Sequence, residues 1–153
     1  MIDASEIRLA LPQDAVRIAT MSRDYVEHGL GWGWTPARVL RSIRDRATNA
    51  VVAECGADLA GFGIMKYLDD DAHLLLFAVK PEYRRRGVGS GLVAWLESTA
   101  TTAGIELIFL ETRATNVAAR GYRELATLPR YYGSEDAVRI GKDLGSFTAA
   151  RSV

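Results

Sequence analysis

The sequence has little cysteine and no excess of charge of either sign. Its single cysteine, Cys55, excludes an internal disulfide and agrees with a reducing compartment, so we expect a cytoplasmic protein. Lysine plus arginine and aspartate plus glutamate both number 19, so no overall field draws the chain to nucleic acid or to an anionic membrane. No apolar run is long enough to span a bilayer, and the first residues lack a signal-peptide pattern. Because the chain as a whole is neutral, a local cluster of like charge would indicate a binding site.

The chain also lacks repeats, low-complexity segments and a metal-binding pattern. Its 153 residues suffice for one domain, which we expect to span 1–153 with a self-sufficient core. Three adjacent aspartates, Asp69–Asp71, lack the alternating ligand spacing of a calcium loop. We therefore expect a solvated turn there and no metal.

A strand, a glycine-rich turn and a helix follow one another between His73 and Gly104. The uninterrupted apolar run Leu74–Val79 predicts a strand buried on both faces. Pro81 ends this run, because proline has no N–H to give to a sheet. From Val88 onward, apolar residues recur at helical spacing, and Gly104 is a suitable C-terminal cap.

The turn carries three arginines before its glycines, Arg84–Arg86 and then Gly87–Ser90. Backbone N–H groups at a helix start attract an anion, and glycine lets a ligand approach without a Cβ in the way. This is not a Walker loop, because no lysine follows the glycines. Nor is it a dinucleotide fingerprint, because Leu92 stands where the third glycine should be. Three arginines beside two glycines favour a pyrophosphate.

Turn and cap signals predict the other elements. A first strand is expected over 6–11, followed by a helix that Asp14 caps and that closes at Gly29. Thr35-Pro36 is an N-cap followed by proline at the first helical position, so another helix starts there. Further strands are expected over 50–55 and 59–67 as a hairpin, over 105–112 in parallel with 74–79, and over 138–144.

The spacing Arg84-x-x-Gly87-x-Gly89 after a strand resembles the acetyl-coenzyme A signature of the GNAT superfamily of N-acetyltransferases. The segment 109–116 is similar to the LEVRxxN stretch of the ribosomal-protein alanine N-acetyltransferases in that superfamily. The tail over 131–137 is similar to their YY…EDA ending. The resemblance implies the GNAT acyl-CoA N-acyltransferase fold, an α/β (α+β) architecture with a mixed central sheet, splayed parallel strands and flanking helices.

The resemblance also implies that acetyl-CoA is the cosubstrate and indicates which residues bind it. In the family, the pantetheine arm enters where the two parallel strands splay and pairs with the backbone of the earlier strand. The glycine-rich turn holds the diphosphate, and an asparagine bonds the pantetheine. The matching positions here are Phe77, Ala78 and Val79 for the backbone, Arg84, Arg85, Arg86, Gly87, Val88, Gly89 and Ser90 for the turn, and Asn116.

Acetyl transfer to an amine needs a group that takes the amine's proton, donors for the oxyanion and a proton for the leaving thiolate. Glu111 matches the family glutamate that is the proposed base, and burial at an apolar strand end would raise its pKa toward the working range. The alternative for Glu111 is a salt bridge to Arg113 or to another arginine. The backbone N–H near Val79 is the candidate oxyanion donor.

The general acid is harder to place, because the family's tyrosine-bearing segment is shortened here. The pair Gly121-Tyr122 resembles the end of that segment but comes too early after Asn116. Either a segment between Arg120 and Gly121 is missing from the sequence, or it is deleted in the protein. If it is deleted, Tyr122, Tyr131 or Tyr132 must serve as the acid, or the thiolate leaves unaided.

The acceptor site has several candidate residues and two interpretations for each. Trp32 and Trp34 either plug the core or line an acceptor pocket, and Tyr131 and Tyr132 either border that pocket or pack on an edge strand. We expect an acetyl-CoA-dependent N-acetyltransferase in which a bound primary amine, a protein N-terminus or a small molecule, attacks directly. The alternative is a non-catalytic acetyl-CoA-binding sensor or interaction module. Homodimers are common in the family, so a homodimer is possible.

Overall fold

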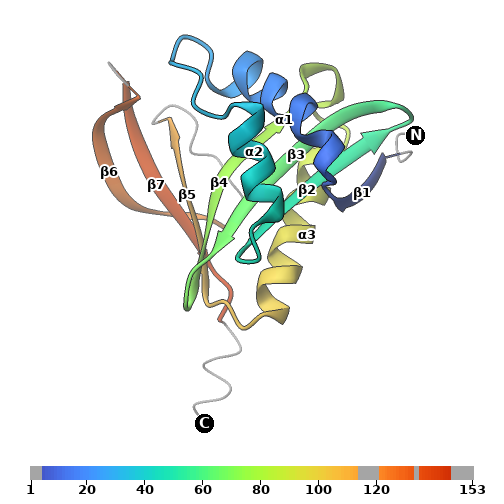
Figure 1. Cartoon of the computed structure of the whole chain (residues 1–153). Helices are drawn as coiled ribbons and strands as arrows, with labels where there is room; N and C mark the ends of the chain where they lie inside the picture. Colours follow the sequence, from blue (N-terminus) through green and yellow to red (C-terminus); the bar gives the residue numbers. More distant parts are fainter. Residues whose placement is uncertain (1–4, 114–120, 133–134, 146–153) are drawn as a thin grey trace. The chain divides into compact units, whose positions relative to one another are not determined.

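The computed structural model describes residues 5–113, 121–132 and 135–145 (Figure 1). Within these ranges, no helix is both long and apolar enough to cross a membrane. Two short 3-10 turns, Pro12–Asp14 and Pro81–Tyr83, precede α1 and α3. The helices and strands in chain order are β1 (Ser5–Leu9), α1 (Ala15–Met21), a π-helical turn (Ser22–Val26), α2 (Pro36–Arg44), β2 (Thr48–Cys55), β3 (Asp58–Tyr67), β4 (Asp71–Val79), α3 (Val88–Thr102), β5 (Leu107–Arg113), β6 (Arg123–Tyr132) and β7 (Glu135–Asp143).

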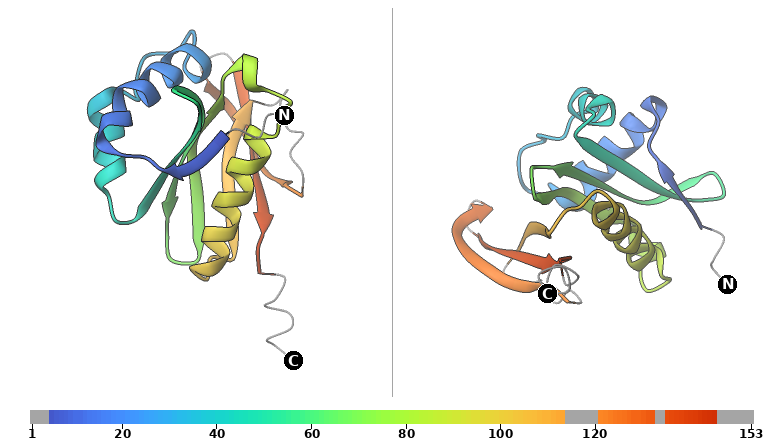
Figure 2. Two further views of the ribbon diagram at one scale, coloured as in Figure 1. Left: turned by 90° about the vertical axis from the view of Figure 1, so that its right-hand side faces the viewer. Right: turned by 90° about the horizontal axis from the view of Figure 1, so that it is seen from below.

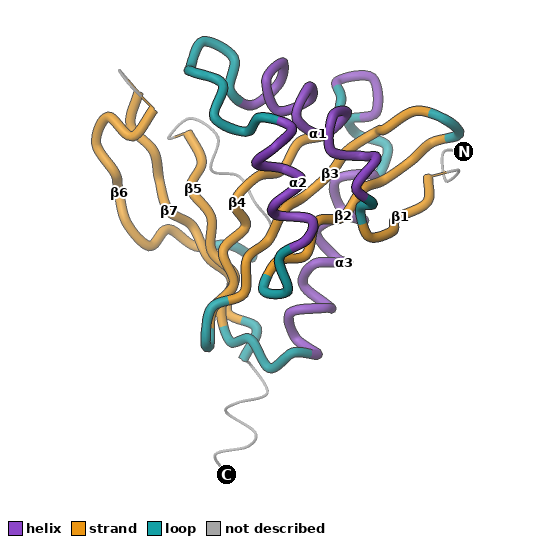
Figure 3. The backbone as a smooth tube through the Cα atoms, viewed as in Figure 1, coloured by secondary structure: helices purple, strands orange, loops and turns teal. Residues whose placement is uncertain are grey.

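The strands form a mixed seven-stranded sheet in the order β1-β2-β3-β4-β5-β7-β6 (Figure 3). β4 and β5 pair in parallel, from Asp71↔Leu107 to His73↔Phe109, as the intervening helix α3 requires. β1 with β2, β2 with β3, β5 with β7 and β6 with β7 pair antiparallel. The predicted fold class, a mixed sheet with flanking helices, is confirmed.

Contacts divide the chain into two compact units. Unit 1 is Met1–Lys66 with Leu75–Leu96, and unit 2 is Tyr67–Leu74 with Glu97–Val153. β4 and α3 contribute residues to both units. The expectation of one domain over 1–153 stays a prediction.

Unit 1 has α1 and α2 on one face of its strands and α3 on the other (Figure 2). On the first face, Ile18, Val39, Phe62 and Ile64 are fully buried in one core. α2 begins as predicted, because the Thr35 hydroxyl accepts a hydrogen bond from the Arg38 backbone N–H and Pro36 follows it. The local signals in the sequence therefore placed this helix correctly.

On the opposite face of unit 1, two glycines of β3 lie against α3. A Cβ on Gly61 would lie 3.0 Å from the carbonyl oxygen of Ala78 and 3.1 Å from Leu92 of α3. A Cβ on Gly63 would lie 3.0 Å from Leu96. The bare backbone of β3 thus lets α3 pack closely on the sheet.

α3 buries the predicted stripe, and its end is capped as predicted. Val88, Leu92, Leu96 and Ala100 are buried at helical spacing. Gly104 has φ +85°, and the next residue returns its N–H to the carbonyl of Ala100 at 3.0 Å. This is the left-handed C-terminal turn that glycine favours.

β4 corrects the prediction of a strand buried on both faces. It begins at Asp71, and burial alternates along it, with Leu76 and Ala78 in the core and Phe77 half-buried. The Phe77 ring lies against the positions of Gly63 and Gly89, which offer no side chain to cover it. Leucine-rich runs hide this alternation, because every residue in them is apolar.

Asp14 also differs from its predicted role, because its side chain does not cap α1. Asp14 is only 1% exposed and accepts hydrogen bonds from the Leu11 backbone N–H at 2.7 Å, from Arg8 at 2.9 Å and from Arg17 at 2.7 Å. Glu54 of β2 binds the same two arginines. The carboxylate therefore ties β1, α1 and β2 together.

We expect Asp14→Asn to lower the free energy of unfolding at pH 7 by about 3 kcal/mol, because it breaks a buried ion pair. Burial alone would raise the pKa of Asp14, but the bonds from Arg8, Leu11 and Arg17 lower it from 3.8 to about 2. A carboxyl group whose pKa is lower in the folded protein contributes its full stabilisation at pH values above its pKa in the unfolded chain. That stabilisation is lost as the pH falls through its pKa in the folded protein. About 2 kcal/mol should therefore disappear between about pH 5 and pH 2 in the wild type but not in the variant.

Urea unfolding across this pH range measures the effect of Asp14→Asn. Asp24→Asn is the matched control, because Asp24 is an exposed partner of Arg23 at 3.0 Å and should change stability by about 1 kcal/mol or less. Equal unfolding midpoints for the two variants would show that Asp14 does not join these elements.

Candidate active site

The turn from β4 into α3 has the backbone shape of an anion site. Arg85 has φ +63° and Gly87 has φ +84°, both in the left-handed region. A Cβ on Gly87 would have nothing within 4 Å, so conformation and not packing makes glycine favourable there. The guanidinium of Arg84 donates to the carbonyl oxygen of Val79 at 3.1 Å, which ties the turn to the end of β4.

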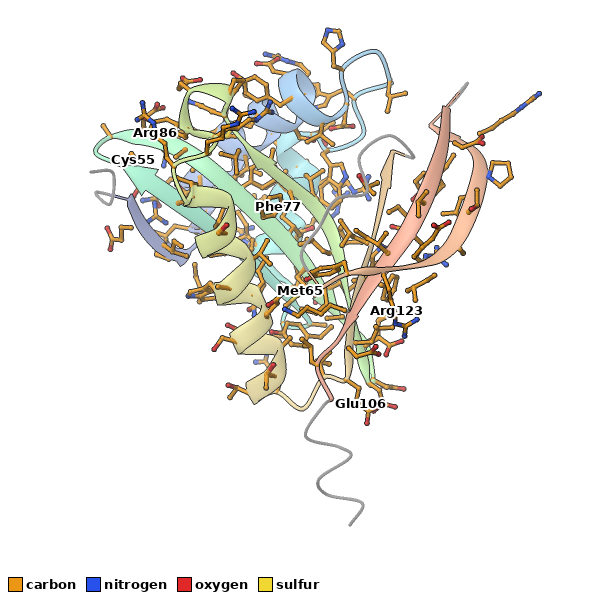
Figure 4. The ribbon with its side chains drawn as sticks, turned by 180° about the vertical axis from the view of Figure 1, so that it is seen from behind. Cys55, Met65, Phe77, Arg86, Glu106 and Arg123 are labelled. Carbon is orange, nitrogen blue, oxygen red and sulfur yellow. The ribbon has the colours of Figure 1, made fainter. Side chains whose placement is uncertain are left out.

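The N–H groups of this turn precede the first backbone hydrogen bond of α3. Within the described parts of the chain, that bond runs from the Gly91 N–H to the Gly87 carbonyl at 2.9 Å. Unpaired N–H groups at a helix start carry partial positive charge. The side chains of Arg84, Arg85 and Arg86 are exposed beside them, with Arg86 near the start of α3 (Figure 4). These groups fit the diphosphate of coenzyme A.

Asp58 at the β2–β3 hairpin anchors the start of this turn. It accepts hydrogen bonds from Lys80 at 2.7 Å and from the Tyr83 hydroxyl at 2.9 Å. Both bonds, that from Lys80 first, lower the pKa of Asp58. The Lys80 backbone N–H donates to Ala60 of β3 at 2.9 Å. The sequence predicted only a hairpin turn at Asp58, since this contact depends on the pairing of strands.

Gly89 gives a test that separates ligand approach from folding. An added Cβ there would make only ordinary contacts, 3.5 Å to Val79 and 4.0 Å to Phe77. Gly89→Ala should therefore keep or raise stability, by up to about 1 kcal/mol, because alanine favours a helix. We expect its affinity for acetyl-CoA to fall about ten- to a hundredfold, the loss of one hydrogen bond to a charged group.

Gly104→Ala is the matched control at the other end of α3. Its φ of +85° disfavours alanine, so stability should fall by about 1 kcal/mol while affinity is unchanged. Calorimetric titration and thermal unfolding of both variants measure the two effects. If Gly89→Ala binds acetyl-CoA as tightly as the wild type, the bare backbone at Gly89 has no role in binding.

Glu111 lies in a cluster of unit 2 that joins three strands. Its Oε1 is 2.6 Å from His73 Nε2 of β4, and its Oε2 is 2.7 Å from Arg139 Nε of β7. The His73 ring stacks on Phe109, with 4.4 Å between centroids and 17° between planes. Arg139 is the register partner of Glu111 between β5 and β7. The ion pair foreseen as an alternative therefore exists, and its observed arginine is Arg139.

The pKa of Glu111 was predicted to be raised, and this prediction is wrong. Burial would raise the pKa of Glu111, as predicted, but the hydrogen bonds from His73 and Arg139 lower it overall. Its side chain is only 7% exposed. Glu111 thus holds a negative charge firmly. The sequence gives no signal for His73 and Arg139, because only the strand register brings them to Glu111.

Tyr122, a candidate general acid, lies in a separate cluster of unit 2. Its hydroxyl donates to Glu97 at 2.8 Å, and Lys142 donates to the same carboxylate at 3.0 Å. Burial, and then the bond to Glu97, raise the pKa of Tyr122. A phenol whose proton is held in this way is a weak acid toward a thiolate.

The two tryptophans of the α1–α2 loop lie in different surroundings. Trp34 is 8% exposed and belongs to the core, with the Arg38 guanidinium 3.8 Å from its ring centre. Trp32 is 41% exposed, and its indole N–H donates to Ala19 at 3.3 Å. The carboxylate of Glu27 accepts the backbone N–H groups of Gly33 and Trp34. The core interpretation fits Trp34, and the acceptor-pocket interpretation remains for Trp32.

The other predicted residues are only partly described. Tyr131 lies on β6, the last strand in the sheet order, and is 52% exposed. Asn116, Arg120 and the side chain of Tyr132 lie outside the described residues. The pantetheine contact of Asn116, the segment between Arg120 and Gly121 and the roles of both tyrosines stay predictions.

Comparison with known proteins agrees with the fold. The model of the acetyltransferase (GNAT) family matches residues 17–125. The alanine N-acetyltransferase of ribosomal protein bS18 from Escherichia coli K12 is 30% identical over 115 residues, which are 69% of this chain and 77% of that protein. An uncharacterized N-acetyltransferase from Methanocaldococcus jannaschii is 38% identical over 100 residues, 60% of this chain and 64% of that one.

Solved structures show the same fold. Ard1 from Thermoplasma volcanium superposes with a TM-score of 0.79 at 26% identity, covering 92% of this chain and 97% of that one. PaiA N-acetyltransferase from Thermoplasma acidophilum, in complex with coenzyme A, gives 0.74 at 20% identity, covering 91% and 98%. The family model spans more than half of the chain, so this protein belongs to the GNAT family of acetyl-CoA-dependent N-acetyltransferases.

Proposed function

We propose that this protein transfers the acetyl group of acetyl-CoA to the amino group of a protein N-terminus by direct attack of the amine. The observation that carries this proposal is the 30% identity to the bS18 alanine N-acetyltransferase over 69% of the chain. We place the activity in the cytoplasm, because the chain has a single cysteine and no possible internal disulfide. A homodimer stays a prediction.

The turn over 84–90 is the proposed diphosphate site. Its support is the set of N–H groups that precede the first hydrogen bond of α3, the left-handed Gly87 and the three exposed arginines. Phe77, Ala78 and Val79 close β4 just before this turn and are the proposed backbone partners of the pantetheine. When bound, acetyl-CoA supplies the thioester carbonyl that the amine attacks.

The amine must be unprotonated when it attacks. A protein N-terminal amine has a pKa of about 7.7–8.0, so a sizeable fraction is neutral near pH 8 before any help from the enzyme. The cluster of His73, Glu111 and Arg139 is the proposed place for the proton released during attack. No covalent acetyl-enzyme intermediate is proposed. The single cysteine, Cys55, is the last residue of β2 and is not among the residues proposed to bind acetyl-CoA.

A thiol-release assay with a panel of amines tests the function. The panel contains a peptide that begins with alanine, the same peptide with a blocked N-terminus and an internal lysine, spermidine and an aminoglycoside. We expect release with the free alanine peptide, and mass spectrometry should place one acetyl group on its N-terminus. Release with spermidine or the aminoglycoside alone would contradict the protein acceptor. Acetyl-CoA binding without release on any amine would support the non-catalytic alternative, which the comparisons do not favour.

A further inference from the structure

We propose that Lys66 is a modification site, the lysine that acetyl-CoA acetylates directly, and that ion pairs shield the other two lysines of the chain. Lysine and arginine together number 19, but only three of these residues, Lys66, Lys80 and Lys142, are lysines. Arginine keeps its charge in proteins, so only the lysines can offer a side-chain amine to a thioester. This proposal does not depend on the acceptor proposed above, because it needs only acetyl-CoA.

Lys80 is shielded in unit 1 by a carboxylate whose position is fixed. Its Nζ donates to Oδ1 of Asp58 at 2.7 Å, and Oδ2 of Asp58 accepts the Tyr83 hydroxyl at 2.9 Å. The tyrosine therefore holds the carboxylate with its other oxygen toward the lysine. The Lys80 side chain is 21% exposed. An ammonium ion has no lone pair, so this nitrogen must leave its charge-assisted hydrogen bond before it can attack a thioester.

Lys142 is shielded in unit 2 by the same combination of groups. Its Nζ donates to Oε1 of Glu97 at 3.0 Å, and Oε2 of Glu97 accepts the Tyr122 hydroxyl at 2.8 Å. The Lys142 side chain is 34% exposed. Two lysines in different units thus share one arrangement, in which a tyrosine holds the carboxylate that binds the ammonium group.

Lys66 lacks this arrangement. Its ion-pair partner in unit 1, Asp45, lies 3.7 Å from its Nζ. Both oxygens of Asp45 are engaged by other donors, one by the Ala47 backbone N–H at 3.0 Å and the other by the Thr48 hydroxyl at 2.9 Å. The Lys66 side chain is 47% exposed, more than either of the other lysines. An exposed pair at this distance contributes little, so the Lys66 nitrogen is the most accessible of the three.

The step balances without a further reactant. The Lys66 ammonium group first loses a proton to water. The lone pair of its nitrogen then forms a bond to the acetyl carbonyl carbon, and the carbon–sulfur bond breaks with its electron pair on the thiolate. A second proton, released from the nitrogen, neutralises the thiolate, so the products are an acetylated lysine and coenzyme A.

The shielding of Lys80 protects the proposed diphosphate site. Acetylation of Lys66 would remove only a weak, exposed ion pair, so the fold should tolerate it. Acetylation of Lys80 would remove the charge that binds Asp58, and this bond anchors the start of the turn over 84–90. The ion pair with Asp58 therefore keeps the enzyme's own cosubstrate from modifying the turn that binds it.

Peptide mapping by mass spectrometry tests the order of reactivity. The folded protein is incubated with excess acetyl-CoA and no other amine, and the acetylated fraction of each lysine is followed over time. We expect Lys66 to react at least about tenfold faster than Lys80 or Lys142, the factor expected when a hydrogen bond to a charged group must break first. In urea, where the chain is unfolded, the three lysines should react at similar rates.

Two variants remove the shields one at a time. Asp58→Asn should speed the acetylation of Lys80 about tenfold and leave that of Lys142 unchanged, and Glu97→Gln should do the reverse. The lysine that stays slow in each variant shows that the fold is intact. Asp24→Asn is the matched control, because Asp24 is exposed and pairs with an arginine at 3.0 Å, so all three rates should stay as in the wild type.

The outcomes are distinguishable. Acetylation of Lys80 or Lys142 as fast as that of Lys66 in the folded protein would overturn the proposal, and so would the same order of rates in urea. An Asp58→Asn variant whose Lys80 is no more reactive than in the wild type would also overturn it. A wild type that acetylates no amine of the acceptor panel would remove the proposed function but leave this proposal standing.

Discussion

Ser90→Glu should abolish acetyl-CoA binding at micromolar concentrations while leaving the fold at least as stable. Ser90 is exposed in the first turn of α3, where a carboxylate is favourable by about 0.3–1 kcal/mol. The same negative charge would face the diphosphate of the ligand. We expect affinity to fall at least about a hundredfold, the equivalent of about 3 kcal/mol of repulsion. Calorimetric titration and thermal unfolding measure the two quantities.

Ser98→Glu is the matched control for this charge. Ser98 is exposed on the same helix but lies well beyond its first turn, so the new carboxylate should change neither affinity nor fold. Equal weakening by the two variants would mean that total charge, and not the start of α3, governs binding.

Glu111→Gln should lower kcat about a hundredfold or more while the affinity for acetyl-CoA stays unchanged. Glutamine keeps the shape but loses the charge that holds His73 and Arg139. The double variant with His73→Gln should be little worse than either single variant, because residues that act as a unit are not additive. Additive losses in kcat would show that the two side chains act separately.

The pH dependence of stability gives a second test of the charge on Glu111. Its pKa is lowered in the folded protein, so its stabilisation is complete above the ordinary glutamate value and is lost as pH falls below it. Glu111→Gln should therefore flatten the loss of stability in acid. Glu106→Gln, an exposed change just before β5, should leave both kcat and this slope unchanged.

The turn and its helix could be predicted because their signals are local. Pro81, the glycines, the apolar spacing of α3 and Gly104 each act within a few residues, and the structure forms the elements that they indicate. The cap by Thr35 succeeded for the same reason. The burial of β4 was mispredicted, because a run of leucines carries no alternation that reveals which face is covered.

The contacts that the sequence could not predict are those set by strand register. Glu111 meets Arg139 and not a nearby arginine, because the two are partners between β5 and β7. His73 reaches Glu111 across the parallel pair of β4 and β5. Asp14 fits an N-cap pattern, but two arginines and the Leu11 N–H compete for its carboxylate.

The binding of coenzyme A by the N–H groups over 85–90 is tested most directly by the backbone amide resonances during titration with coenzyme A. We expect the largest shifts at Arg85, Arg86, Gly87, Val88, Gly89 and Ser90, because these amides lie in the turn and at the start of α3, where the diphosphate is proposed to bind. Binding that leaves these resonances unmoved and shifts others would contradict the account.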